Sequence, residues 1–325
     1  MLYLEELLDV VLSEEGQTLM GLDFLIETLD LPMKKIDNIF KKALSEYSER
    51  RPMKKTTVIN NYAIDPDGNT GYIQMPEGTT SCRVARYGVL PNQMPRYYMP
   101  KFGEQMVEFD PVTLTCRVWP PVTPLRLTYT QKYMPKTNIL LNGQINSSYE
   151  MDELNLTLPT MFAGKTLKFE KIVTVLDEET GEEVTKVLEM APVPDPEVAD
   201  ITCPCKDNVI LLAGTLGTGT MDVTTREIEA ELSEEAISGA NPITYSYYPK
   251  YSVVEELDIG HYVLTKMFAA KLLTALAALR SQATQEKLHN LDLTTDDLFT
   301  RAQELKKEVR EICRSTISFG DMAPM

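Results

Sequence analysis

The sequence predicts an α+β fold in which a helical bundle, formed by the N- and C-terminal segments, carries a large inserted β-rich region. Both ends of the chain place hydrophobic residues at helical spacing. The middle is rich in proline, glycine and tyrosine, and short strand-like runs alternate there with turn signals. Neither helical end can easily bury its apolar surface alone. We therefore expect a bundle of residues 1–52 and 251–315, an inserted β-rich domain of residues 53–250, and an extended tail of residues 316–325.

Two helices are expected at the N-terminal end. The first has the hydrophobic repeat Leu4, Leu7, Leu8 and Val11, and breaks follow at Gly16 and Gly21. Another is expected to begin near Pro32, with Asp30 as its cap, and to stop at Pro52. Its apolar stripe consists of Ile36, Ile39, Phe40, Ala43, Leu44 and Tyr47.

The clearest strand candidates of the middle region are VARYGVL, LTCRVW, LRLTYTQKY, KTLKFEKIVTVL, EVTKVLEM and NVILLAGTL. VLDEETGEEVTKVLEM predicts a hairpin that turns around Thr180 and Gly181. MDVTTREIEAELSEEAIS fits a short amphipathic helix, although MDVTTREIEAEL also fits a strand. GTLGTGT lacks the lysine of a phosphate-binding loop, so we expect a strand followed by a flexible turn.

The apolar stretch of residues 261–283 raises the question of whether it crosses a membrane or fills a core. Lys266, Lys271 and Arg280 interrupt it, and a lysine in mid-bilayer is costly. We therefore expect a buried helix and no membrane association. Thr294 or Thr295 is expected to cap a last helix. Its apolar seam consists of Leu298, Ala302, Leu305, Val309 and Ile312.

Acidic residues dominate the charge of the chain. Among 325 residues, 48 acids against 32 bases give a net charge of −16. This balance argues against stable nucleic-acid binding, which needs clustered cations, but not against DNA that passes an acidic wall. The N-terminus is acidic and has no basic segment of a secretory signal, so the cytoplasm is the default compartment.

No pattern in the sequence assembles a catalytic, cofactor or metal site. The five cysteines are scattered and fit reduced thiols. Cys203 and Cys205 lie too close together for a zinc knuckle, and no other ligands flank them. Neither histidine is placed beside a nucleophile motif. We expect no enzyme activity, no cofactor and no metal.

Two aromatic loops and the C-terminal tail are candidates for protein–protein contact, because tyrosine, methionine and arginine are enriched at interfaces. The candidate residues are Tyr97, Tyr98, Phe102, Tyr247, Tyr248, Phe319, Met322 and Met325. The alternative for the loops is that they seal the β region against the helices. The tail is either frayed or docked on another chain.

LDFLIETLDLPMKKIDNIFKKALSEYSERRP, PEGTTSCRVARYGVLP, EFDPVTLTCRVWPPVTPLRLTYTQKY and the closing helices together resemble the neck proteins, or head-to-tail connectors, of large contractile-tailed bacteriophages. The resemblance implies a virion structural protein that is assembled in the bacterial cytoplasm and lies in the neck. It implies a homo-oligomeric ring of twelve or six copies, with the portal and tail proteins as partners and DNA passing unbound through the lumen. The alternative is another virion role, such as tail terminator, collar, baseplate or decoration protein.

Overall fold

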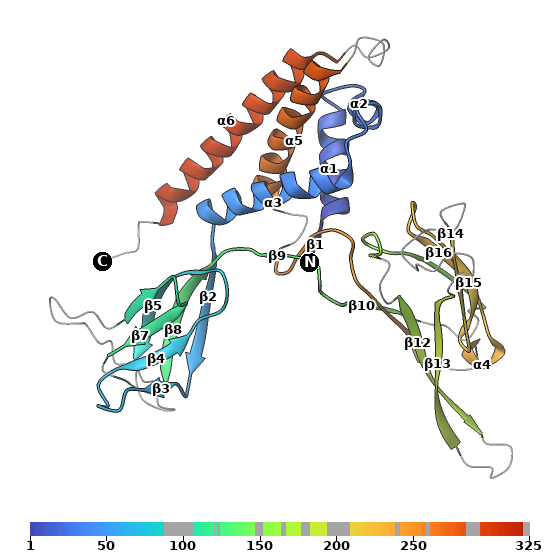
Figure 1. Ribbon diagram of the computed structural model, residues 1–325, viewed down its shortest axis with the longest axis horizontal. Coiled ribbons are helices and arrows are strands. Elements are labelled where there is room, and N and C mark those ends of the chain that lie inside the picture. Colours follow the sequence, from blue (N-terminus) through green and yellow to red (C-terminus); the bar gives the residue numbers. More distant parts are fainter. Residues whose placement is uncertain are drawn as a thin grey trace. The chain divides into compact units, whose positions relative to one another are not determined.

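A computed structural model describes most of the chain. The described residues are 1–87, 107–119, 121, 124–146, 152–163, 167–176, 183–193, 209–237, 241–257, 261–283 and 293–320. Within them the helices are α1 (Leu4–Gly16), α2 (Leu22–Thr28), α3 (Met33–Arg50), α4 (Glu234–Ile237), α5 (Tyr262–Gln282) and α6 (Thr295–Gly320) (Figure 1).

Strands outnumber helices along the whole middle of the chain. The first half holds β1 (Leu2–Tyr3), β2 (Met53–Ile59), β3 (Ala63–Ile64), β4 (Gly71–Gln74), β5 (Thr79–Tyr87), β6 (Val107–Asp110), β7 (Thr115–Val118), β8 (Leu125–Gln131) and β9 (Pro135–Lys136). The second half holds β10 (Leu141–Ile145), β11 (Glu153–Thr157), β12 (Lys168–Leu176), β13 (Glu183–Pro192), β14 (Val209–Gly214), β15 (Gly217–Asp222), β16 (Glu227–Leu232), β17 (Ile243–Tyr247) and β18 (Val253–Val254).

The predicted fold class, a helical bundle with a β-rich insertion, is wrong. More of the described residues lie in strands than in helices, and one curled sheet of eight strands dominates the architecture. The physical reason is that the middle of the chain has enough alternating apolar residues to build cores of its own. It does not depend on the helices for burial, so it is more than an insertion carried by them.

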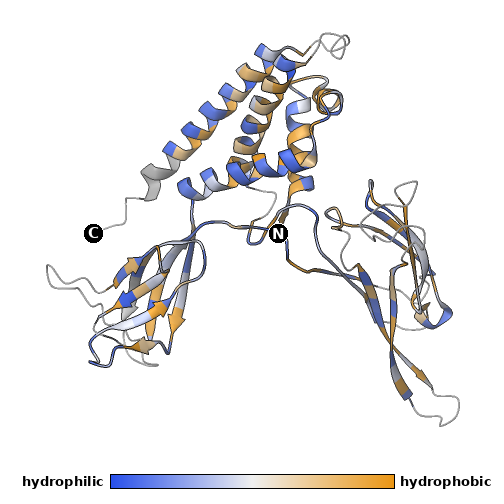
Figure 2. Ribbon diagram, viewed as in Figure 1, coloured by the Kyte–Doolittle hydropathy of each residue, from blue (hydrophilic) through white to orange (hydrophobic). Residues whose placement is uncertain are grey.

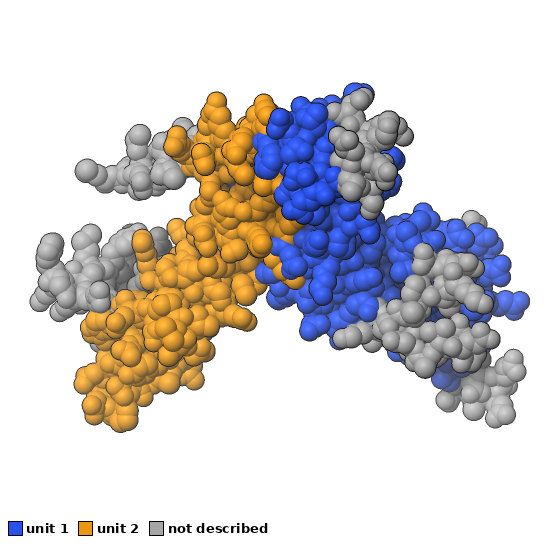
Figure 3. All heavy atoms as spheres, turned by 45° about the horizontal axis from the view of Figure 1, so that its top comes forward, with its two compact units in different colours: residues 1–38, 135–265, 275–299 blue, residues 39–134, 266–274, 300–325 orange. Residues whose placement is uncertain are grey.

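The chain divides into two compact units, coloured separately in Figure 3. Unit 1 comprises residues 1–38, 135–265 and 275–299, and unit 2 comprises residues 39–134, 266–274 and 300–325. Each unit therefore draws on early, middle and late parts of the sequence. The sequence-based boundaries near residues 52 and 250 stay a prediction.

Unit 1 is built on the eight-stranded antiparallel sheet, whose strand order is β10-β17-β12-β13-β14-β15-β16-β11. Alternation of side chains along each strand puts one face of this sheet into a core that includes Phe169, Met190, Ile228 and Tyr247. Strands β12 and β13 form a long antiparallel hairpin, as the sequence predicts, although the turn itself lies outside the described residues. The N-terminal strand β1 pairs with β18 in a separate three-stranded sheet.

Unit 2 contains two smaller antiparallel sheets. Their strand orders are β2-β8-β5 and β3-β4-β7-β6, and both contribute to one core that includes Ile73, Cys116, Leu125 and Leu127. A two-sheet packing of this kind buries the inner side chains of both sheets at once. In the described part of the chain, Cys82, Cys116 and Cys313 are free thiols.

Helical residues from the two ends of the chain meet within unit 2. The ring of Phe40 on α3 contacts the ring of Phe268 on α5. Lys271 of α5 forms an ion pair with Glu46 of α3 at 2.7 Å, and Lys266 pairs with Glu308 of α6. Two of the three cationic residues that interrupt the apolar stretch, Lys266 and Lys271, are thus paired with carboxylates.

Most residues of the predicted apolar stripes of α3 and α6 are confirmed as buried, whereas α2 was not predicted. Of the predicted α3 stripe, all but Ile39 are buried, and of the α6 seam all but Ile312 are buried. Helix α5 is the one described helix that is long and apolar enough to cross a bilayer. In the structure, 67% of its most apolar stretch of 18 residues is buried. Figure 2 shows hydrophobic residues along most of α5, while hydrophilic residues predominate on α6. This burial is what a core helix requires.

Candidate functional site

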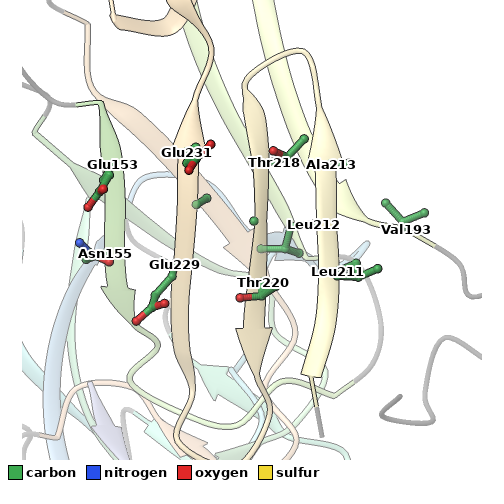
Figure 4. A pocket seen from close by; sticks show the side chains of 12 residues that line it. Glu153, Asn155, Val193, Leu211, Leu212, Ala213, Thr218, Thr220, Glu229 and Glu231 are labelled. Carbon is green, nitrogen blue, oxygen red and sulfur yellow. The ribbon is translucent and has the colours of Figure 1, made fainter. Parts of the chain in front are cut away.

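The outer face of the eight-stranded sheet carries an unusual set of side chains in unit 1. Strands β11 and β16 alternate between buried and exposed positions, so every second side chain points away from the core. On these strands and on β14 and β15, the outward residues line an open hollow of about 760 Å³. Figure 4 shows Glu153, Glu229 and Glu231 together on this side, with Thr218 and Thr220 on the next strand.

Carboxylates face one another across this sheet. Glu153 lies directly opposite Glu231 in the pairing of β11 with β16, and Glu229 lies two residues from Glu231 on the same strand. Like charges at directly opposite positions destabilise a sheet. No cation of the described residues forms an ion pair with any of the three carboxylates. The electrostatic repulsion among these three carboxylates is therefore not offset by any cation of the described residues.

Aliphatic side chains flank the carboxylates. Leu211 on β14 is 57% exposed, and the neighbouring Val193 is 45% exposed. The backbone N–H of Val193 donates a hydrogen bond to the carbonyl oxygen of Leu211 at 2.9 Å, which holds the two side by side. We call the surface formed by Glu153, Glu229, Glu231, Leu211 and Val193 the acidic face. It combines exposed charge with exposed apolar area, as surfaces that bind other proteins do.

A second surface, in unit 2, has the opposite charge. The end of α3, the start of β2 and the later part of α6 line an open groove of about 940 Å³. Its lining residues are Arg50, Arg51, Pro52, Lys54, Arg310, Cys313 and Arg314. We call this the basic groove.

The cations of the basic groove differ in how they are paired. Arg50 forms an ion pair with Glu46 at 2.7 Å, one turn earlier on α3. Lys54, Arg310 and Arg314 are exposed, and no carboxylate of the described residues pairs with them. An acidic chain of net charge −16 thus keeps a local concentration of positive charge.

A buried polar cluster in unit 1 joins α1 to the β region. The Glu5 side chain is buried, and its Oε1 accepts hydrogen bonds from the hydroxyl of Thr160 at 2.7 Å and from the N–H of Met161 at 2.9 Å. Similarly, Asp37 accepts a hydrogen bond from the N–H of Ser252 at 3.1 Å. Carboxylates of the N-terminal helices therefore satisfy loop N–H groups that would otherwise be buried without partners.

The same cluster contains polar atoms without a hydrogen-bond partner among the described residues, namely Glu5 Oε2 and Ser252 Oγ. Burial raises the pKa of the Tyr247 phenol. Its ring is completely buried beside Tyr245 and belongs to the core of unit 1. We interpret the cluster as a structural joint, because its members lie inside the packed core.

Of the residues predicted to lie at an interface, the structure gives the burial of only two side chains, Tyr247 and Tyr248. Tyr247 is buried in the core and Tyr248 is half-buried. Tyr97, Tyr98, Phe102, Met322 and Met325 lie outside the described residues, as do Cys203 and Cys205, and for Phe319 the structure describes only the helical backbone. The interface role of these residues stays a prediction.

The acidic face was missed at the sequence level although a signal for it exists. EIEAEL alternates carboxylates with apolar residues, and this period of two is typical of a half-buried strand with an acidic outer face. The basic groove has only part of its signal in one place: Arg50, Arg51 and Lys54 lie close together in the sequence, but Arg310 and Arg314 come from a distant segment that local patterns do not connect to them. In the described parts of the chain, no group of three or more His, Cys, Asp or Glu side chains is placed to hold a metal ion.

We compared the chain with protein-family models, curated protein sequences and solved structures, and none of them matches it.

Proposed function

We propose that this protein is a structural component of a bacteriophage neck. In this role several copies form a ring that connects the portal to the tail, and DNA passes through the ring without being bound. The resemblance of its sequence segments to neck proteins motivates the proposal. The single structural observation that supports it is the acidic face, an open surface whose charge the described residues do not compensate and which another protein chain would cover.

The shape of this surface favours assembly over catalysis. The hollow lies on the open face of a sheet, whereas active sites for small molecules are usually concave pockets that enclose most of the ligand. Carboxylates that repel each other across neighbouring strands favour a partner that supplies positive charge. Acidic surfaces that remain uncovered would also repel packaged DNA and allow it to slide.

Imaging of the particle tests the proposal. We expect virions from cells that encode this chain to contain it, and electron microscopy to place it as a closed ring at the junction of head and tail. Purified protein should give ring-shaped particles in negative stain. A position elsewhere on the virion would point to a tail terminator, baseplate or decoration protein instead. Absence from purified virions, together with a monodisperse monomer in solution, would contradict any virion role.

A further inference from the structure

The chain has two surfaces of opposite charge, the acidic face and the basic groove. The acidic face belongs to unit 1 and the basic groove belongs to unit 2. Each holds charges that the described residues leave without counter-charges. A surface of this kind costs free energy when it is desolvated alone and regains it only against a complementary partner.

We infer that the acidic face of one copy binds the basic groove of the next copy. This inference rests on the proposed function, because it names the surfaces through which the ring would close. The contact is heterologous, since two different surfaces meet, and heterologous contacts generate rings when the rotation between copies closes. The occupant of the acidic face is therefore a second copy of this chain.

The spacing of the charges supports the pairing. Arg310 and Arg314 are one helical turn apart on α6, which corresponds to a rise of about 6 Å. Glu229 and Glu231 are two residues apart on β16, which corresponds to about 7 Å. The two exposed arginines can thus each face one carboxylate when the helix lies along the strand. Arginine can pair with a carboxylate through two parallel hydrogen bonds, which adds geometric specificity.

The edges of the two surfaces also fit together. Glu153 lies on the strand beside β16, about 5 Å from it, and extends the acidic surface sideways. Lys54, on β2, extends the basic groove sideways from α6 in the same manner. Leu211 and Val193 on one surface and Pro52 and Cys313 on the other supply apolar area.

DNA is the other ligand that a basic groove could bind, but the observations favour a protein surface. Arg50 of the groove is already paired with Glu46 at 2.7 Å, which leaves Lys54, Arg310 and Arg314 as cations that no carboxylate of the described residues pairs with, and three cations are few for a phosphate backbone. Net charge does not distinguish the two ligands, because a chain of charge −16 repels DNA and a second copy alike at longer range. The chain itself, by contrast, presents carboxylates at matching spacing.

Charge reversal in the full-length chain tests the pairing. One variant carries Glu153→Lys, Glu229→Lys and Glu231→Lys, and a second carries Lys54→Glu, Arg310→Glu and Arg314→Glu. In each variant the two surfaces have the same sign, so we expect self-association, measured by analytical ultracentrifugation and mass photometry, to weaken by at least about 100-fold. An equimolar mixture of the two variants restores complementary charges at every contact and should recover assembly. A variant that carries all six substitutions should assemble as the wild type does.

Matched controls separate specific pairing from a change in net charge. Asp9→Lys, Glu14→Lys and Glu27→Lys change three exposed acids on helices of unit 1, and Lys42→Glu, Arg126→Glu and Lys307→Glu change three exposed cations of unit 2. Both control variants should assemble as the wild type does. Circular dichroism of every variant checks that it folds.

The possible outcomes keep the two proposals apart. Rings that persist in both charge-reversed variants would overturn the pairing and leave the neck function standing. A dimer that follows the same charge rules but never grows would uphold the pairing and contradict the ring. A wild-type chain that stays monomeric would overturn the pairing, and one that is also absent from purified virions would overturn the neck function as well. Binding of a labelled DNA duplex that only the groove variant loses, with assembly unchanged, would assign the basic groove to nucleic acid.

Discussion

The rings of Phe40 and Phe268 meet edge to face, with their centroids 5.8 Å apart and their planes at 87°. Both side chains are completely buried. Phe40 comes from the N-terminal part of the chain and Phe268 from the C-terminal part. The contact therefore joins two segments of unit 2 that are far apart in the sequence. Aromatic pairs in this geometry contribute beyond the area that they bury.

The first prediction concerns this pair. Phe268→Ala leaves a cavity beside Phe40, and we expect it to lower the free energy of unfolding by about 3–5 kcal/mol. Phe24→Ala is the matched control, because the Phe24 side chain is 52% exposed and its loss should cost under about 1 kcal/mol. Urea denaturation followed by circular dichroism measures both. Equal losses in the two variants would contradict the packing of Phe268 against Phe40.

The second prediction concerns the joint between α1 and the β region. Glu5→Ala removes the acceptor for the Thr160 hydroxyl and the Met161 N–H and leaves both without a partner, which should destabilise unit 1 by about 1–3 kcal/mol. Glu5→Gln keeps an acceptor oxygen and should lose less. Hydrogen exchange of the Met161 amide provides a local measure.

Glu14→Ala is the control for this variant, because Glu14 is exposed on the same helix. It should leave the exchange rate of Met161 unchanged. If Glu5→Ala leaves that rate unchanged as well, the carboxylate does not hold the loop.

Local sequence patterns predicted the elements of this fold well. The seam of Leu298, Ala302 and Leu305 follows the helical period, and these residues are buried as expected. Strands β12, β13 and β14 coincide with the predicted apolar runs. The helical and strand periods are set by residues that are close together in the chain. A short stretch of sequence is therefore enough to predict such a helix or strand.

The predictions failed or stayed open where the outcome depends on residues far apart. MDVTTREIEAEL left helix and strand open, because its apolar residues fit both periods, and the strand alternative is confirmed by the pairing of β16 with β11 and β15. GTLGTGT was expected to end in a flexible turn, but β15 begins at Gly217 because β14 and β16 both offer it hydrogen-bond partners. The fold class failed for the same reason. Local patterns do not show that the strands of the middle region form cores of their own.

The third prediction concerns Gly219 on β15, which pairs with Ala230 of β16. A Cβ at this position would lie 2.3 Å from the carbonyl oxygen of Glu229 and 2.4 Å from the Cβ of Ala230. Since a carbonyl oxygen of the sheet cannot move aside freely, Gly219→Ala should cost about 1–3 kcal/mol and disturb the pairing of β15 with β16. Gly16→Ala is the control, because no atom lies within 4 Å of its added Cβ, and it should change stability by under about 0.5 kcal/mol. Thermal unfolding compares the two, and a neutral Gly219→Ala would contradict the close approach of these strands.

The fourth prediction concerns the N-terminus of α6, where Thr294 and Asp297 cap each other. The Thr294 hydroxyl accepts a hydrogen bond from the Asp297 N–H at 3.2 Å, and the Asp297 carboxylate accepts bonds from the Thr294 hydroxyl at 2.6 Å and from its N–H at 2.8 Å. The bond from the Thr294 hydroxyl is the main cause that lowers the pKa of Asp297 below its ordinary value of 3.8. A carboxyl with a lowered pKa stabilises the folded state above its unfolded pKa, and this contribution is lost as the pH falls through the folded pKa.

Asp297→Asn mimics the protonated acid and should therefore unfold at a lower temperature than the wild type at about pH 7, with the difference shrinking towards about pH 3. Asp296→Asn is the matched control, because Asp296 lies in the same first turn and is equally exposed. Its effect should be smaller at about pH 7, since it loses only the favourable placement of a negative charge at a helix N-terminus. Thermal unfolding followed by circular dichroism across this pH range provides the measurement. A difference between wild type and Asp297→Asn that stays constant with pH would show that the cap does not depend on the charge of Asp297.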